Sequence, residues 1–263
     1  MTLIIGIQCS DGVVVGSDGA ATLGALGNQT VQQPVKKLAI ISGSVILGVS
    51  GPVGLGQRFH GELQALWDGK KLSSKKPYEA MSIIRPEFWK HAELEFRAAQ
   101  VTAPMLGQPA LNGALSHSVV AMPLSKDAHL FQFDQNCSPE LATTDLPFIA
   151  VGSGQKGADP FLAFLRRIFW TNGQPSVADG VFATIWCLDQ AIRTNPGGVG
   201  DPIQVMTLEK ITGNWAAREL SALDFEEHRQ NIAEAEQALA NYKKEQTTGG
   251  KSAPPPPPEP ERV

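Results

Sequence analysis

Two β-hairpins open the chain, and their strands are apolar on both faces. Each hairpin consists of two short, almost wholly apolar runs joined by a glycine-containing turn, at residues 3–9 and 13–17 and then at 35–42 and 45–50. Antiparallel hairpins usually alternate apolar and polar residues, because one face is dry and the other wet. Runs that do not alternate therefore predict a sheet that other elements cover on both sides.

Helices that could cover such a sheet are predicted from apolar residues at helical spacing, at 53–67, 78–99, 159–170 and 177–193. Further strands are predicted at 118–123, 129–133, 148–151, 203–208 and 215–220. Residues 101–115 contain Gly and Pro breakers without an apolar period, which predicts a long loop. Two helices lie before the middle strands and two after them, so we predict an α+β fold arranged as a four-layer αββα sandwich.

The composition divides the chain into three parts. Residues 1–221 contain no linker and are predicted to form one domain. Residues 222–247 are rich in helix formers, which predicts a long and mostly solvated C-terminal helix. Residues 248–263 hold six of the 19 prolines and nothing that could be buried, so they predict a disordered proline-rich tail.

Charge and composition exclude several classes of protein. Lys and Arg number 22 against 26 Asp and Glu, a net charge of −4 that does not fit a strongly basic nucleic-acid-binding protein. No apolar run reaches the roughly 18 residues of a membrane span, and no basic signal-peptide segment precedes the first strand, so we expect a soluble, cytoplasmic protein. The three cysteines are far apart and the five histidines scattered, so we expect no disulfide, no metal site and no cofactor.

One glycine-rich motif, Gly152-Ser-Gly154-Gln-Lys-Gly157, matches the Gly-x-Gly-x-x-Gly pattern of dinucleotide-binding proteins. Such a site requires this turn to end the first strand of a parallel βαβ unit, with an acidic residue roughly 20 positions later that ends the next strand. Asp179 lies at that distance, but in a segment with helical spacing. A dinucleotide site is therefore disfavoured.

Thr2 is a candidate nucleophile. Its side chain is small enough for Met1 to be removed, which would leave a threonine with a free α-amino group. An α-amino group has an ordinary pKa of about 7.7 to 8.0, so near pH 7 it can accept the hydroxyl proton. A threonine at this position is common and alone indicates nothing. However, Asp18 and Lys37 interrupt strands that are otherwise apolar, and we expect these two charges to pair beside the first strand.

Several segments resemble the β-type subunits of the proteasome. They are Thr2-Leu-Ile-Ile-Gly-Ile, Asp11-Gly-Val-Val-Val-Gly-Ser-Asp18-Gly-Ala-Ala-Thr-Leu-Gly24, Val35-Lys-Lys-Leu38, Gly48-Val-Ser-Gly51-Pro-Val-Gly54 and Ile149-Ala-Val-Gly-Ser-Gly154. The run from Asp18 to Gly24 is most similar to HslV-type bacterial peptidases, while the added C-terminal parts suggest the betaproteobacterial proteasome homologues. The resemblance spans about residues 2–220 and implies an N-terminal nucleophile hydrolase fold, which is also an αββα sandwich.

The resemblance also implies a role for each matching residue. Thr2 would be the nucleophile, Lys37 the lysine that tunes it, Asp18 the carboxylate that holds the lysine, Gly51 the backbone donor of an oxyanion hole and Ser153 the hydroxyl near the α-amine. The glycine-rich motif would then be a turn beside the active site. Where the family carries Asp-x-x-Ser before a Gly-Gly pair, this chain has Arg193 and Pro196, so both polar residues are missing.

A substrate pocket is implied by the same match. Ala21, Val49 and Val53 would receive the side chain that precedes the cleaved bond. None of the three carries a charge, so an acidic or basic side chain would lose its hydration without gaining a partner. We expect apolar residues to be preferred there.

The resemblance implies a self-compartmentalising threonine endopeptidase that cleaves peptides or unfolded proteins through an acyl ester on Thr2. It also implies stacked homo-oligomeric double rings, hexameric or heptameric with heptameric favoured, and it leaves open an ATPase unfoldase as partner. Two alternatives keep the fold. One is a hydrolase of small amides, and the other is an inactive ring-forming scaffold whose polyproline tail binds partners.

Overall fold

The computed structural model describes the chain except for residues 1, 24–30, 107, 172, 195–197 and 249–263. One antiparallel sheet has the order β10 (Phe148–Val151), β1 (Ile4–Gln8), β2 (Gly12–Ser17), β11 (Gln204–Ile211) and β12 (Asn214–Glu219). A second has the order β5 (Leu38–Ile41), β6 (Val45–Ser50), β7 (His117–Leu124), β8 (Asp127–Phe133) and β9 (Pro139–Leu141). The prediction of a mixed helix and sheet fold with antiparallel strands is confirmed.

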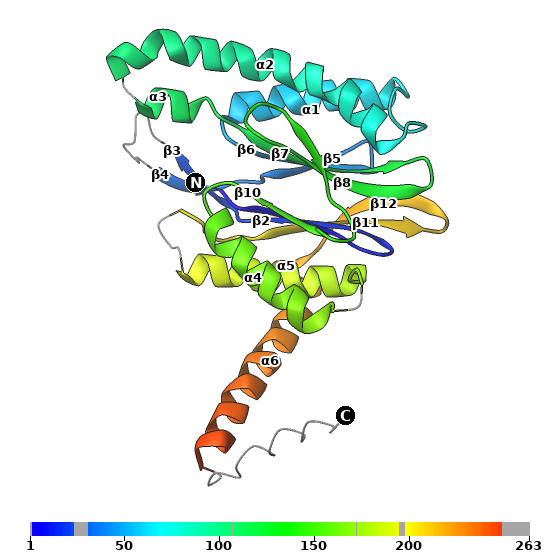
Figure 1. Ribbon diagram of the computed structural model, residues 1–263, viewed down its shortest axis with the longest axis vertical. Coiled ribbons are helices and arrows are strands. Elements are labelled where there is room, and N and C mark those ends of the chain that lie inside the picture. The colour runs from blue at the N-terminus through cyan, green and yellow to red at the C-terminus, as the bar shows by residue number, and fades with distance from the viewer. Residues whose placement is uncertain (1, 24–30, 107, 172, 195–197, 249–263) are drawn as a thin grey trace, which may run out of the picture.

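Helices lie on the outer faces of the two sheets (Figure 1). The second sheet carries α1 (Val53–Asp68) and α2 (Pro77–Leu106), and the first carries α4 (Gln155–Phe169) and α5 (Val177–Thr194). Two further helices, α3 (Gln108–Gly113) and α6 (Ala222–Thr248), follow α2 and β12. None of the helices in the described ranges is long and apolar enough to span a membrane.

The strand β1 explains why its sequence does not alternate. Ile5 and Ile7 pack with α4 and α5, whereas Ile4 packs between the two sheets with residues of β6 and β7. All three side chains are 0% exposed. Both faces of β1 therefore meet apolar surroundings, as the unbroken apolar run predicted.

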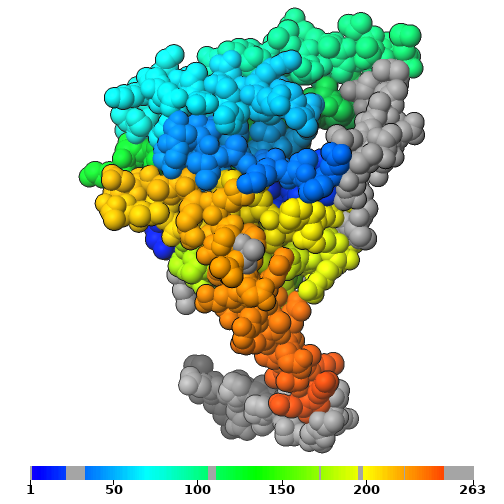
Figure 2. Space-filling view, turned by 180° about the vertical axis from the view of Figure 1, so that it is seen from behind, coloured from blue at the N-terminus to red at the C-terminus, as the bar shows by residue number. Residues whose placement is uncertain are grey.

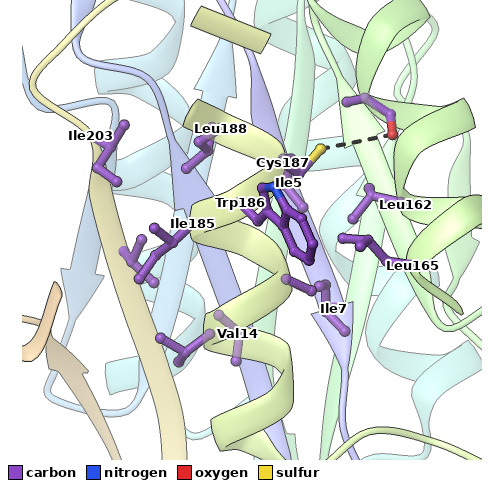
Figure 3. Packing of buried hydrophobic residues seen from close by; sticks show 14 of the residues in the cluster. Ile5, Ile7, Val14, Leu162, Leu165, Ile185, Trp186, Cys187, Leu188 and Ile203 are labelled. Atoms are coloured by element: carbon purple, nitrogen blue, oxygen red, sulfur yellow. Dashed lines mark hydrogen bonds between the residues drawn. The ribbon is translucent and has the colours of Figure 1, made fainter. Parts of the chain in front are cut away.

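The core beneath α4 and α5 is closely packed around an indole ring (Figure 3). Trp186 of α5 is 5% exposed and meets the edges of two phenylalanine rings, Phe161 and Phe182. The neighbouring Cys187 donates from its thiol to the backbone oxygen of Ala158, 3.8 Å away. These contacts hold both helices firmly on the sheet that carries the N-terminal strand.

The prediction of a long loop at 101–115 is wrong. The helix α2 continues to Leu106, and α3 occupies Gln108–Gly113. Pro104 lies near the end of α2, where it removes one backbone hydrogen bond, the bond to the carbonyl of Gln100. Gln100 is exposed, so water can solvate that carbonyl and the helix continues past the proline.

The strand predicted at 35–42 is shorter in the structure, which has only Leu38–Ile41 in β5. The preceding residues form a small separate sheet in which β3 (Ala20–Leu23) pairs with β4 (Val31–Pro34). Pro34 ends β4, because proline has no N–H to donate to a further strand. The strand β9 was not predicted.

The C-terminal helix α6 leaves the body of the molecule, and its far half projects into solvent (Figures 1 and 2). Its near half packs on α5 through Ile232, which is 4% exposed, with Phe225 and Ala235 beside it. Farther along the helix, Leu239 and Tyr242 are 58% and 65% exposed. The helix was predicted as mostly solvated, and most of its described residues are exposed, in the near half as well as in the far half. The predicted tail lies almost entirely outside the described residues.

Candidate active site at the N-terminal strand

Thr2 lies two residues before the start of β1, under the turn that follows β10. Its backbone nitrogen donates to Ser153 Oγ at 3.1 Å, and its carbonyl oxygen accepts from the backbone nitrogen of Gly154 at 3.2 Å. Gly152 has φ +97°, and a Cβ there would lie 2.3 Å from the Thr2 oxygen. Only glycine allows this approach, so the glycine-rich motif encloses Thr2.

Asp18 follows β2, which pairs with β1, and its carboxylate is 0% exposed. One carboxylate oxygen accepts from the backbone nitrogen of Leu3 at 2.9 Å, beside Thr2. The other accepts from the backbone nitrogens of Ala20 and Gly200, each at 3.2 Å. Three backbone donors from three segments therefore hold the carboxylate, which makes a buried charge tolerable.

Lys37 comes directly before β5 and reaches back to Asp18. Its Nζ lies 2.6 Å from Asp18 Oδ1, and its side chain is 7% exposed. Burial lowers the pKa of Lys37, and the hydrogen bond and charge of Asp18 act in the opposite direction. The predicted pairing of these two charges agrees with this geometry.

Gly51 follows β6 with φ +140°. A Cβ at this position would lie 2.7 Å from the backbone oxygen of Leu115 and within 3 Å of two atoms of Ser116. The backbone of β6 and the segment before β7 thus approach each other at a point where a side chain cannot fit. Glycine is required here for the fold, whatever else its backbone N–H does.

A cavity of about 710 Å³ opens at this point and brings most of the candidate residues together. Thr2, Lys37 and Gly51 line it, together with all three predicted pocket residues, Ala21, Val49 and Val53. Asp18 and Ser153 contact two of the lining residues from outside the cavity. Val53 is 71% exposed and therefore lies at the rim of the pocket.

Two polar residues of α1, Gln57 and His60, also line the cavity and were missed by the sequence analysis. They share one face of the helix with Val53, since positions separated by three or four residues lie together. Their helical spacing from the predicted pocket residue Val53 was the signal from which they could have been predicted. Lys36 is a further lining residue, so the pocket wall is less uniformly apolar than Ala21, Val49 and Val53 suggested.

Arg193, at the position where the resemblance implied a carboxylate, lies at the end of α5 and contacts Glu236 of α6 at 3.7 Å, away from this cavity. Pro196 lies outside the described residues. Among the residues that the structure describes, no three His, Cys, Asp or Glu side chains lie close enough to hold a metal ion.

The glycine-rich motif also has the wrong context for a dinucleotide. The strand β10 that precedes it pairs antiparallel with β1, whereas the dinucleotide fold requires a parallel βαβ unit.

No protein-family model matches this sequence, and no curated protein matches it either. Solved structures do match. Anbu (ancestral beta-subunit) from Yersinia bercovieri is 14% identical with a TM-score of 0.66, over 91% of this chain and 97% of that chain. Anbu from Hyphomicrobium sp. strain MC1 is 16% identical with a TM-score of 0.64, over 96% of this chain and 99% of that chain.

The chain has a proteasome β-subunit-like fold. A third match is the Anbu complex from Pseudomonas aeruginosa, described as a helical assembly, at 16% identity and a TM-score of 0.63 over 97% of this chain and 98% of that chain. These likenesses support the proteasome-like part of the resemblance, and they do not support the HslV type in particular.

Proposed function

We propose that this chain is a threonine peptidase in which processing removes Met1 and makes Thr2 the N-terminal nucleophile of a four-layer αββα hydrolase. The observation that carries the proposal is the cavity in which Thr2, Lys37 and Gly51 meet. Beneath it, Asp18 holds the lysine, and Ser153 accepts from the nitrogen that would become the α-amino group.

In the proposed reaction, the Thr2 hydroxyl attacks the carbonyl carbon of a peptide bond while the α-amino nitrogen takes its proton. The Lys37 ammonium, held by Asp18, favours the neutral form of that amine and stabilises the developing alkoxide. The backbone N–H of Gly51 would donate to the tetrahedral oxyanion, a contribution of about 3 to 4 kcal/mol. The leaving amine takes up the proton, and water then hydrolyses the acyl ester on Thr2.

Thr2→Ala tests the assignment of the nucleophile. Fluorogenic peptide cleavage should disappear, while the melting temperature and the oligomeric state stay unchanged, because the hydroxyl makes no large packing contribution. Intact mass spectrometry should show that Met1 is absent from active protein. Full activity in Thr2→Ala, or active protein that retains Met1, would contradict the mechanism.

Two further assays on the wild-type protein, hydrolysis of small amides and labelling by threonine-directed electrophiles, separate the two alternatives. A protein that hydrolyses one small amide but no peptide fits the amidase, and a ring that does not react with threonine-directed electrophiles fits the scaffold.

The substrate preference follows from the pocket. We expect cleavage after apolar residues, because Ala21, Val49 and Val53 present apolar surface and each Å² of it that is buried contributes about 25 cal/mol. Gln57 and His60 could form hydrogen bonds with a longer, polar side chain of the substrate that extends past Ala21, Val49 and Val53. A peptide library with every residue class at that position measures the preference, and dominant cleavage after charged residues would contradict it.

Homo-oligomerisation is part of the proposal, with heptameric double rings favoured over hexameric ones. The Pseudomonas aeruginosa neighbour is described as a helical assembly, so open helices are the competing arrangement. Electron microscopy of the purified protein distinguishes closed rings of seven from closed rings of six and from helices.

A further inference from the structure

Two buried glutamines bridge the two sheets of this protein, one at each end of the sheet–sheet core. Gln204 of β11 accepts from the backbone nitrogen of Leu38 at 3.0 Å and donates to the oxygen of the same residue at 3.3 Å. Leu38 is the first residue of β5, which is the edge strand of the other sheet. The amide of Gln204, which is 6% exposed, thus pairs with Leu38 as a neighbouring strand would.

Leu38 directly follows Lys37, and the residue on the other side of Lys37 is held as well. Lys36 Nζ lies 2.8 and 3.0 Å from the two carboxylate oxygens of Glu219 on β12. Gln204 Nε2 also donates to Glu219 Oε1, at 3.2 Å. Gln204 and Glu219 therefore form a connected clamp that contacts the residues on both sides of Lys37, and we call it the Gln204–Glu219 clamp. Its contact with Lys36 is the weaker one, because that side chain is 73% exposed.

The clamp also connects the backbone around Lys37 with β2, the strand that directly precedes Asp18. In the pairing of β11 with β2, Gln204 lies opposite Ser17, the residue before Asp18. One residue thus connects Leu38, through its side chain, with the position next to Asp18, through its backbone pairing. A lysine side chain has a flexible four-carbon stem, so the site of its ammonium group depends on where its backbone is fixed.

We propose that Gln204, supported by Glu219, is the positioning residue that sets Lys37 against Asp18 and Thr2. Its kinetic consequence rests on the proposed peptidase function, whereas the clamp can be tested without any activity. A displacement of about 1 Å in a catalytic group can lower the rate on the order of 10²-fold. Loss of the clamp should therefore lower kcat roughly 10- to 100-fold. Gln204 does not line the cavity, but Lys36 and Leu38 do, so we expect a rise in KM that is much smaller than the loss of kcat.

Gln8 provides a matched control. It also bridges the two sheets by two hydrogen bonds, since its Nε2 donates to the oxygen of Ala128 at 3.1 Å and its Oε1 accepts from the nitrogen of Leu130 at 3.0 Å. Its Nε2 lies in addition within 3.4 Å of the oxygens of Cys9 and Gly12. It is 9% exposed. Gln204→Met and Gln8→Met therefore remove equivalent bridges, one beside Lys37 and one beside β8.

Both methionine variants should lower the melting temperature to a similar extent, and only Gln204→Met should lower kcat. Equal losses of kcat in the two variants would reduce Gln204 to a structural role and overturn the proposal. So would an unchanged kcat in Gln204→Met.

A reciprocal exchange tests the support from Glu219. Gln204→Glu places a second carboxylate against Glu219 and also removes the donor to the Leu38 oxygen. The additional change Glu219→Gln restores only the bond between positions 204 and 219. We expect kcat to fall in Gln204→Glu and to recover several-fold in the double variant. If the double variant is no better than Gln204→Glu, Glu219 does not support Gln204. Glu219→Ala changes only the surface member of the clamp and leaves Gln204 in place. Its loss of kcat keeps the inference testable if the variants at the buried position 204 fold poorly.

Amide hydrogen exchange of the segment 36–41 provides the readout that does not depend on catalysis. The Leu38 amide should exchange faster in Gln204→Met than in Gln8→Met, also when both carry Thr2→Ala. If wild-type protein has no Thr2-dependent activity, the proposed function fails while this measurement still tests the clamp. If activity depends on Thr2 but Gln204→Met changes neither kcat nor the exchange of the Leu38 amide, the clamp proposal fails while the proposed function stands.

Discussion

Two of the ion-pair sites in this molecule differ in their distances, in their burial and in the groups that support them. At the N-terminal strand, Lys37 and Asp18 lie 2.6 Å apart with side chains 7% and 0% exposed. Between α5 and α6, Asp189 meets Arg229 at 3.8 Å with side chains 18% and 43% exposed, beside the similar pair of Arg193 and Glu236. These four residues line a second cleft of about 370 Å³.

The difference shows what a buried ion pair requires. A charge removed from water is costly unless hydrogen bonds replace the lost hydration, and Asp18 accepts from three backbone nitrogens besides Lys37. The pairs between α5 and α6 remain partly hydrated, are long, and are screened by salt. The buried pair fixes the position of the Lys37 Nζ, whereas the exposed pairs only contribute to the seam, the contact surface between α5 and α6.

The largest effect is expected for Asp18→Ala. It leaves the Lys37 ammonium buried without its carboxylate and leaves three backbone donors without an acceptor, which should destabilise the fold by about 3 to 5 kcal/mol. Urea unfolding measures the loss, and peptide cleavage should vanish. A loss below about 1 kcal/mol would place this pair in the same class as the surface pairs.

Lys37→Met should cost less stability than Asp18→Ala, although it also abolishes activity. Methionine fills the space of the lysine stem, and Asp18 keeps its three backbone donors, so the loss is that of one hydrogen bond to a charged group, about 1.5 to 3 kcal/mol. The same unfolding experiment compares the two variants. The reverse order of stability would show that the backbone donors contribute little.

Asp18→Asn keeps the shape of the side chain and removes its charge, so its effect should appear mainly in the pH dependence. Burial lowers the pKa of Lys37 from its ordinary value of 10.5, and Asp18 raises it. Without the carboxylate charge, the lowering prevails and the ammonium loses its proton at a lower pH. The alkaline limb of kcat/KM should therefore move to lower pH than in wild type, and an unmoved limb would show that Lys37 does not set it.

Arg229→Ala should have the smallest effect, a loss of less than about 1 kcal/mol that decreases further as salt is added. Peptide cleavage should be unchanged, because the pair lies between α5 and α6, away from Thr2. Thermal melts at low and high ionic strength measure both points. A large, salt-independent loss would mean that this seam is as well compensated as the buried pair.

The sequence predicted those parts of the fold that depend on local periodicity. The unbroken apolar run of β1 indicated burial on both faces, and charges inside apolar strands indicated the pair of Asp18 and Lys37. The prediction of a loop at 101–115, which was based on composition, was wrong. Glycine and proline near an exposed helix end cost less free energy than their number suggests. For Gly51 and Ser153, only the family resemblance pointed to the site.

Other contributors left no signal in the sequence. Gln204 contacts Leu38 across 166 positions of chain, and a glutamine in a strand has no pattern that reveals a partner at such a distance. Gln57 and His60 could have been placed on one helical face with Val53. That this face borders the cavity, however, depends on how α1 packs on its sheet.

The shared register of β1 has a consequence for the length of the chain. Ile4 lies opposite both Ser17 of β2 and Val151 of β10, so one strand sets the spacing between Thr2, Asp18 and the glycine-rich turn at once. A residue inserted into or deleted from β1 would have one of two effects. Either the side chains of β1 after the change turn to the opposite face, or they keep their register and Thr2 shifts by about 3.4 Å relative to Asp18. We therefore expect β1 to accept many substitutions of one apolar residue for another but no change in its number of residues.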